Sequence, residues 1–94
     1  ALCIAIGDGH AGYLEKIDTH GALVITGGAT RQETVRRGLE ALDSQGARPD
    51  IILIHDAARP CVTPELIGRL CDDAAAHGAA IPAVPLTDSI KRLK

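Results

Sequence analysis

Residues 50–60 read Asp-Ile-Ile-Leu-Ile-His-Asp-Ala-Ala-Arg-Pro, an apolar run that stops at two polar side chains. We interpret residues 50–55 as a buried strand, because a short apolar run between polar residues is typical of parallel sheets. Asp56 and Arg59 would then stand at the carboxyl end of that strand. Ligands of open α/β sheets bind at this edge, so the stretch predicts both a parallel sheet and a site.

The rest of the chain alternates short apolar runs with helical patterns. The predicted strands are residues 2–6, 22–25, 50–55 and 79–86, with a further strand beginning at residues 90–93. The predicted helices are residues 11–17, a helix that starts at residue 31, and residues 64–77. This alternation predicts an α/β fold of three layers, in which helices cover both faces of a mostly parallel sheet.

Two of the helices carry their boundaries in the sequence. Thr30 and Glu33 have the Thr-x-x-Glu spacing of a capping box, which predicts that a helix starts at residue 31. Thr63 can cap the next helix, and Pro64 suits its first position. Gly78 should end that helix, because glycine commonly follows the last helical turn.

Composition and charge exclude several classes of function. The 94 residues carry a net charge of −2, so neither a nucleic acid nor a membrane surface is expected as the main partner. No apolar run approaches the ~20 residues of a membrane helix. Three cysteines without metal-ligand spacing indicate reduced thiols in a cytoplasmic protein. Phe and Trp are absent, and with so few large side chains for a core the chain is expected to be part of a larger domain.

The turn after the first strand matches a dinucleotide fingerprint. Residues 7–12 read Gly-Asp-Gly-His-Ala-Gly, a Gly-x-Gly-x-x-Gly pattern between a strand and a helix. The fingerprint also needs an acid at the end of the second strand, to bind a ribose hydroxyl. That strand ends Val-Ile-Thr-Gly at residues 24–27, without an acid. An ordinary glycine-rich turn is therefore favoured, and an NAD-binding Rossmann fragment is kept as an alternative.

Three later loops are the other candidate sites. In residues 27–34, either two glycines let backbone amides face a ligand, or the loop only caps the next helix. In residues 56–59, either Asp56 and Arg59 bind a metal and a phosphate, or they pair and shape the loop. Residues 88 and 89, Asp-Ser, would alone be an exposed turn. All three loops would meet at one edge of a parallel sheet, which favours a shared ligand site.

Three motifs together resemble a known enzyme family. They are Gly-Gly-Ala-Thr-Arg-Gln-Glu-Thr-Val from residue 27, His-Asp-Ala-Ala-Arg-Pro from residue 55, and Val-Pro-Leu-Thr-Asp-Ser-Ile-Lys-Arg from residue 84. In this order and spacing the chain resembles 2-C-methyl-D-erythritol 4-phosphate cytidylyltransferase, over essentially its whole length. The resemblance implies a Rossmann-like nucleotidyltransferase fold. Residues 1–94 would be the central part of a single domain of that fold, which is therefore incomplete here.

The resemblance also implies an activity and a set of site residues. The activity is transfer of CMP from CTP to 2-C-methyl-D-erythritol 4-phosphate in non-mevalonate isoprenoid biosynthesis, with Mg²⁺, release of pyrophosphate, and a homodimer. The implied residues are Gly28, Ala29 and Thr34 for the cytosine, Asp56 and Ala57 for the ribose, Asp56, Arg59 and Ser89 for the methylerythritol phosphate, and Asp56 for the metal. The family often has an acid where Ala29 stands and usually Thr where Ser89 stands.

No catalytic residue is expected among these 94. The family's Gly-rich loop with its Arg and Lys, and a later strand with further Arg and Lys, would lie outside the segment. Nucleotidyl transfer depends mostly on positioning and charge stabilisation, so the segment alone is expected to be inactive. Besides the NAD-binding alternative, a non-enzymatic α/β module that docks a partner or regulatory ligand is also kept.

Overall fold

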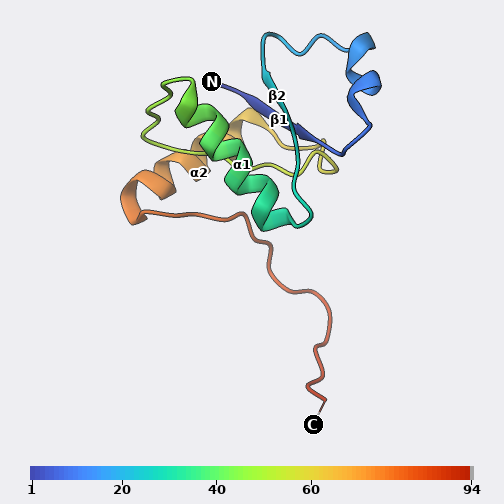
Figure 1. Cartoon of the computed structure of the whole chain (residues 1–94). Helices are drawn as coiled ribbons and strands as arrows, with labels where there is room; N and C mark the ends of the chain where they lie inside the picture. Colours follow the sequence, from blue (N-terminus) through green and yellow to red (C-terminus); the bar gives the residue numbers. More distant parts are fainter. Residues whose placement is uncertain (94) are drawn as a thin grey trace. The chain divides into compact units, whose positions relative to one another are not determined.

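The computed structural model describes residues 1–93, and within them the chain forms two compact units. The first unit is Ala1–Asp50, and the second begins at Ile51. The elements are β1 (Cys3–Ile6), the 3₁₀ helix η1 (Ala11–Lys16), β2 (Leu23–Thr26), α1 (Arg31–Ser44) and α2 (Pro64–His77). Figure 1 shows their order along the chain. No helix among the described residues is long and apolar enough to cross a bilayer.

The first unit is built on two parallel strands and one helix. Strands β1 and β2 pair in register, from Cys3 beside Leu23 to Ile6 beside Thr26, and α1 contacts both of them. The prediction of strands at residues 2–6 and 22–25 is confirmed to within one residue. The helix predicted at residues 11–17 is a 3₁₀ helix of six residues, which has no side-chain cap. So short a segment forms too few α-helical hydrogen bonds to offset the cost of starting an α-helix, and short segments often form 3₁₀ helices instead.

Helix α1 starts where its capping pattern predicts. The Thr30 hydroxyl accepts a hydrogen bond from the Glu33 amide at 3.1 Å, and Arg31 is the first helical residue. The Glu33 carboxylate reaches back to the amide of Ala29, at 2.9 Å, which lies one residue before the amide that a capping box uses. Glu33 therefore ties the start of the helix to the loop that precedes it.

In the second unit, both predicted ends of α2 are confirmed. The Thr63 hydroxyl accepts from the Leu66 amide at 3.2 Å, and Pro64 occupies the first helical position. At the other end Gly78 adopts the left-handed conformation, with φ of 87°, and its amide donates to Ala74. A residue with a Cβ is disfavoured at this φ, which explains glycine here.

The predicted three-layer, mostly parallel sheet is not confirmed. Within residues 1–93 the only sheet has two strands, and residues 50–55, 79–86 and 90–93 contain no strand. A strand needs a neighbour to accept and donate its ladder hydrogen bonds, and an apolar pattern does not supply that neighbour. Ile52, Leu53 and Ile54 accordingly stay about half exposed, at 50%, 53% and 56%. The structure supports a small α/β unit with a two-stranded parallel sheet.

Candidate functional site

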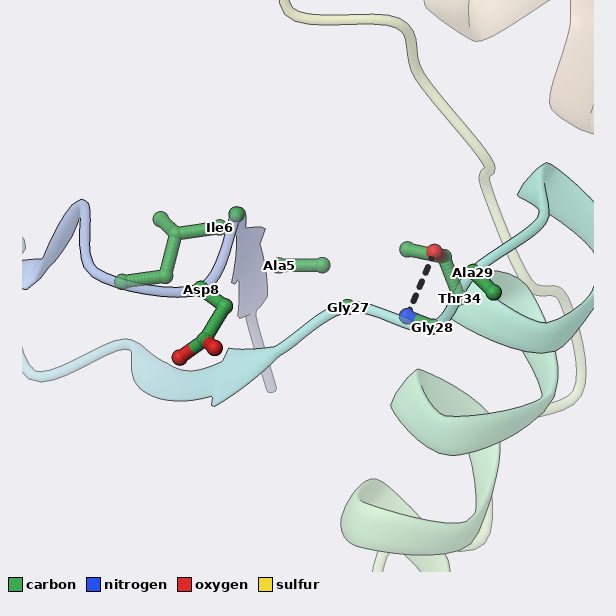
Figure 2. A pocket seen from close by; sticks show the side chains of 8 residues that line it. Ala5, Ile6, Asp8, Gly27, Gly28, Ala29 and Thr34 are labelled. Carbon is green, nitrogen blue, oxygen red and sulfur yellow. Dashed lines mark hydrogen bonds between the residues drawn. The ribbon is translucent and has the colours of Figure 1, made fainter.

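A pocket of about 390 Å³ lies at the carboxyl ends of β1 and β2 (Figure 2). We call it the strand-end pocket, and its lining residues are Ala5, Ile6, Gly7, Asp8, Gly27, Gly28, Ala29 and Thr34. All of them belong to the first unit. The carboxyl edge of parallel strands is the position where α/β proteins bind ligands, so this pocket lies at the kind of edge where the sequence predicts a site, and ligand binding there stays a prediction.

The loop between β2 and α1 forms one wall of this pocket. The Gly28 amide donates to the Thr34 hydroxyl at 2.9 Å, and that hydroxyl donates to the Thr30 carbonyl at 3.0 Å. The Gly27 amide donates to the Ile6 carbonyl at 2.8 Å, which joins the loop to β1. A Cβ on Gly28 would lie 2.4 Å from Cγ of Glu33. Glycine is therefore required here by close packing against α1.

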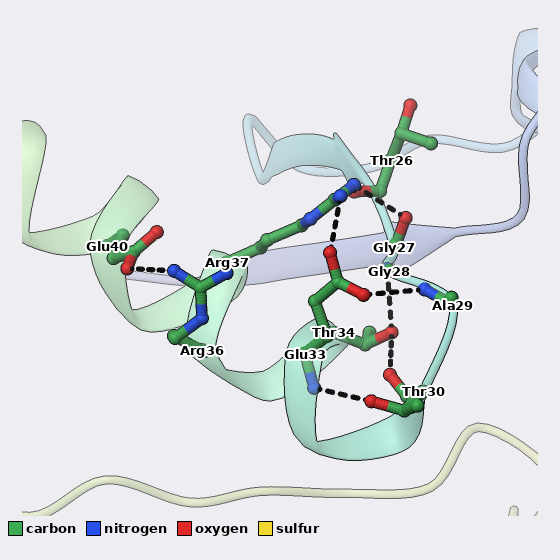
Figure 3. Close-up of polar contacts among 10 residues, drawn as sticks. All are labelled: Thr26, Gly27, Gly28, Ala29, Thr30, Glu33, Thr34, Arg36, Arg37 and Glu40. Atoms are coloured by element: carbon green, nitrogen blue, oxygen red, sulfur yellow. Dashed lines mark hydrogen bonds and ion pairs between the residues drawn. The ribbon is translucent and has the colours of Figure 1, made fainter.

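Glu33 and Arg37 hold the same loop from α1 (Figure 3). One carboxylate oxygen of Glu33 accepts from the Ala29 amide, and the other pairs with Arg37 at 2.6 Å. Arg37 also donates to the Gly27 carbonyl at 2.9 Å and to the Thr26 carbonyl at 3.5 Å. The hydrogen bond from Ala29, followed by the hydrogen bond and charge of Arg37, lowers the pKa of Glu33. Glu33 is therefore ionised at neutral pH.

These contacts refine the two interpretations of residues 27–34. The amides of Gly28 and Ala29 donate to side chains of α1, as the capping interpretation requires. Yet Gly28, Ala29 and Thr34 also line the strand-end pocket. The loop is thus both a cap and a pocket wall. Both amides are already bonded to the Thr34 and Glu33 oxygens, so a ligand that left this network intact would bind the wall through its other atoms.

The Asp56–Arg59 loop of the second unit is a closed turn. The Arg59 amide donates to the Asp56 carbonyl at 3.0 Å, and the two side chains form an ion pair at 3.3 Å. The His55 ring nitrogen lies 2.9 Å from the Arg59 carbonyl. The Arg59 side chain is 79% exposed. An exposed pair of this kind contributes only about 0–1 kcal/mol, so it shapes the loop and leaves the guanidinium accessible.

Of the remaining predicted site residues, the structure brings together only those at residues 56–59. Asp56, Ala57 and Arg59 share one turn, while Ser89 is exposed in a stretch without helix or strand. Convergence of the three loops on one edge stays a prediction. In residues 1–93, no group of three or more His, Cys, Asp or Glu residues could hold a metal, and the metal role of Asp56 also stays a prediction.

The glycine pattern at residues 7–12 forms an ordinary turn, as favoured from the sequence. The His10 amide donates to the Gly7 carbonyl at 3.1 Å, and Gly9 has φ of 74°. A 3₁₀ helix follows, instead of the α-helix that a dinucleotide fingerprint needs. The NAD-binding alternative is therefore not favoured, although Gly7 and Asp8 do line the pocket.

Sequence reasoning missed the parts played by Glu33 and Arg37. The sequence predicts Glu33 only as half of a capping box with Thr30. The two residues stand at i and i+4, the spacing at which Glu and Arg meet on one helix face. That spacing could have indicated the ion pair. The bonds from this pair to the loop depend on how the loop turns, which the sequence does not reveal.

Two parallel strands, the helix that contacts both and a pocket at the strand ends define a small α/β unit. The family model of 2-C-methyl-D-erythritol 4-phosphate cytidylyltransferase (IspD) matches residues 1–94. The chain therefore belongs to this family, and the resemblance seen in its three motifs is confirmed.

Curated relatives support the same assignment. The chain is 61% identical over 69 residues to the bifunctional enzyme IspD/IspF of Rhodopseudomonas palustris (strain CGA009), which covers 73% of this chain and 17% of the relative. It is 61% identical over 67 residues to that of Nitrobacter winogradskyi, covering 71% of this chain and 16% of the relative. The chain thus spans about a sixth of the length of these relatives. No solved structure matches it.

Proposed function

We propose that the protein carrying this chain transfers CMP from CTP to 2-C-methyl-D-erythritol 4-phosphate and releases pyrophosphate, in non-mevalonate isoprenoid biosynthesis. The observation that carries the proposal is the family match over all 94 residues. The strand-end pocket supports it, because its wall contains Gly28, Ala29 and Thr34, the residues predicted to bind the cytosine.

Each predicted loop has a role in this proposal. Gly28, Ala29 and Thr34 would lie against the cytosine, and Asp56 and Ala57 near the ribose. Asp56, Arg59 and Ser89 would hold the methylerythritol phosphate. The exposed guanidinium of Arg59 suits this part, because its fork of donors matches a phosphate.

The metal in this proposal is Mg²⁺, held at Asp56. The residue fits, because Mg²⁺ in such sites is usually bound by one or two carboxylates together with substrate phosphates. The Asp56 side chain is 43% exposed in its turn, so its carboxylate can meet a hydrated ion. When bound, the metal would neutralise charge on the phosphates.

The same proposal places the catalytic cations outside residues 1–94 and describes the enzyme as a cytoplasmic homodimer. Within this segment the residues bind and orient, and the charge that stabilises the transferring group comes from elsewhere in the enzyme. The net charge of −2 is consistent with small anionic substrates held by a few local cations.

Pyrophosphate release by the full-length protein tests the proposal. With CTP, methylerythritol phosphate and Mg²⁺ we expect stoichiometric pyrophosphate, and none when either substrate is omitted. Arg59→Ala should raise the KM for methylerythritol phosphate. The control is Arg69, an exposed arginine of α2, and Arg69→Ala should leave this KM unchanged. Thermal stabilisation by NAD alone would support the Rossmann alternative. No response to CTP or NAD would support a non-enzymatic module.

A further inference from the structure

One pair of side chains from α1 binds both carbonyls and an amide of residues 26–29, which are the end of β2 and the loop that follows it. On the carbonyl side, Arg37 donates to Gly27 at 2.9 Å and to Thr26 at 3.5 Å. On the amide side, Glu33 accepts from Ala29 at 2.9 Å. The two side chains also bind each other at 2.6 Å, so the loop and the first turns of α1 form one connected network (Figure 3).

This Glu33–Arg37 pair lies outside the strand-end pocket. The loop residues Gly27, Gly28 and Ala29 line the pocket, and neither Glu33 nor Arg37 does. Their side chains are 30% and 43% exposed, so solvent does not fully screen the pair. Contact with a ligand in the pocket would come through the loop, and the pair acts on the ligand only by fixing the shape of that loop.

A fixed loop matters because of its sequence. Two adjacent glycines have more backbone freedom than any other pair of residues. A ligand that must order such a loop when it binds is bound less tightly. Charge-assisted hydrogen bonds are stronger than neutral ones, and here they anchor carbonyls and an amide on both sides of the glycines. The network therefore orders the pocket wall before a ligand arrives.

We propose that Glu33 and Arg37 are positioning residues that hold the loop of residues 27–29 in its ligand-binding shape and so set the affinity for the nucleotide. The inference rests on the proposed cytidylyltransferase function for the identity of the ligand. The hydrogen bonds by which the pair holds the loop do not depend on that function. Neither residue is catalytic, because neither lines the pocket.

The same helix offers a matched control. Arg36 and Glu40 form an i, i+4 ion pair at 2.8 Å, with side chains 62% and 61% exposed, and their hydrogen bond is to each other. Replacing a member of this pair removes a surface ion pair from α1 without touching the loop. Glu40→Gln thus matches Glu33→Gln, and Arg36→Lys matches Arg37→Lys.

The experiment compares these four variants in the full-length protein. For Glu33→Gln we expect the KM for CTP to rise about tenfold, the effect of one lost charge-assisted hydrogen bond. The kcat and the KM for methylerythritol phosphate should change less than about twofold. Arg37→Lys keeps the charge but loses the fork that spans carbonyl and carboxylate, so it should show a smaller rise. Glu40→Gln and Arg36→Lys should match the parent protein.

Amide hydrogen exchange gives a readout that does not depend on activity. In Glu33→Gln the Ala29 amide should exchange about tenfold faster, while amides in the middle of α1 keep their rates. Faster exchange across all of α1, or an equal effect of Glu40→Gln, would overturn the inference in favour of general helix stabilisation. Faster exchange at Ala29 with an unchanged KM for CTP would also overturn it. If the parent protein did not use CTP at all, the proposed function and the nucleotide role of the pair would fail together. Unchanged exchange at Ala29 in Glu33→Gln would show that the Glu33–Arg37 pair does not hold the loop.

Discussion

Gly28 is placed so that its missing side chain allows the loop and α1 to meet. A Cβ there would lie 2.4 to 2.6 Å from Cγ, Cδ and Cβ of Glu33. The Cβ of Glu33 is fixed by the helix backbone, so a rotamer change cannot relieve the overlap. The loop would have to move, and it would carry the Ala29 amide and the Thr34 contact with it.

Gly28→Ala should therefore weaken CTP binding by about tenfold or more, since at least one hydrogen bond of the loop is lost. Titration calorimetry on the full-length protein measures this. Gly12→Ala is the control, because a Cβ on Gly12 meets nothing within 4 Å. An unchanged affinity in Gly28→Ala would mean that the loop can shift without cost, and that it does not bind the base.

Gly38 is a contrasting case, because this glycine is not required by packing. It lies inside α1, and its added Cβ would lie 3.9 Å from Cys3 Sγ and 3.9 Å from Ile25 Cδ1, ordinary contact distances. Alanine is favoured over glycine in a helix interior by about 1 kcal/mol. Gly38→Ala should thus raise the free energy of unfolding by up to about 1 kcal/mol, measured by urea denaturation. A loss of stability would indicate that α1 lies closer to the strands than these distances allow.

Because the ionised form of Glu33 holds the loop, the loop should lose order only when the pH falls. Its pKa is lowered by the Ala29 amide and by the charge of Arg37, with a smaller contribution from Arg36. A group with a lowered pKa stabilises the folded form at pH above its ordinary value, about 4.3, and loses that effect as pH falls through the lower folded value. Protection of the Ala29 amide should be constant from about pH 5 to 8 and fall only under more acidic conditions. A fall between pH 6 and 7 would implicate another group.

At the scale of elements, the two long helices were predictable and the later strands were not. Helix starts depend on one side-chain oxygen and an amide three residues later, as in Thr30 and Thr63. Such signals are local, so the sequence contains them in full. A strand depends on a partner far away in the chain, and the apolar run at residues 51–54 does not say which segment that is. The candidate site divides in the same way: the pocket wall follows from local capping, while convergence with Asp56 and Ser89 needs the whole sheet.

The caps of α2 give a test at this scale. Thr63→Ala removes the oxygen that accepts from the Leu66 amide and should cost about 1 kcal/mol of stability. Thr63→Ser keeps that oxygen and should cost little. Gly78→Ala should also cost about 1 kcal/mol, because φ of 87° is unfavourable for alanine. Thermal unfolding of the full-length protein checks all three, and equal stability of the Ala and Ser variants would contradict the role of the cap.

At the scale of the whole molecule, the described residues do not complete a core. No side chain in residues 1–93 is fully buried, and large apolar residues such as Leu53 and Val84 stay exposed at 53% and 88%. Burial of apolar surface is the main source of stability in a domain, so the described residues gain little of it by themselves. The chain spans about a sixth of the length of the relatives that it matches.

A segment of residues 1–94 produced alone should therefore release no pyrophosphate from CTP and methylerythritol phosphate, even with Mg²⁺ at millimolar concentration. Two independent causes predict this. The proposed catalytic cations lie outside the segment, and charge stabilisation by such groups typically accounts for factors of about 10²–10³ each. The described residues also form a sheet of only two strands, so the parallel sheet expected for the family is not complete in them. A coupled phosphate assay, run beside the full-length protein at equal concentration, measures the difference. Turnover by the segment above background would show that the catalytic groups lie among these 94 residues, and the roles assigned to Arg59 and Asp56 would then have to extend from binding to catalysis.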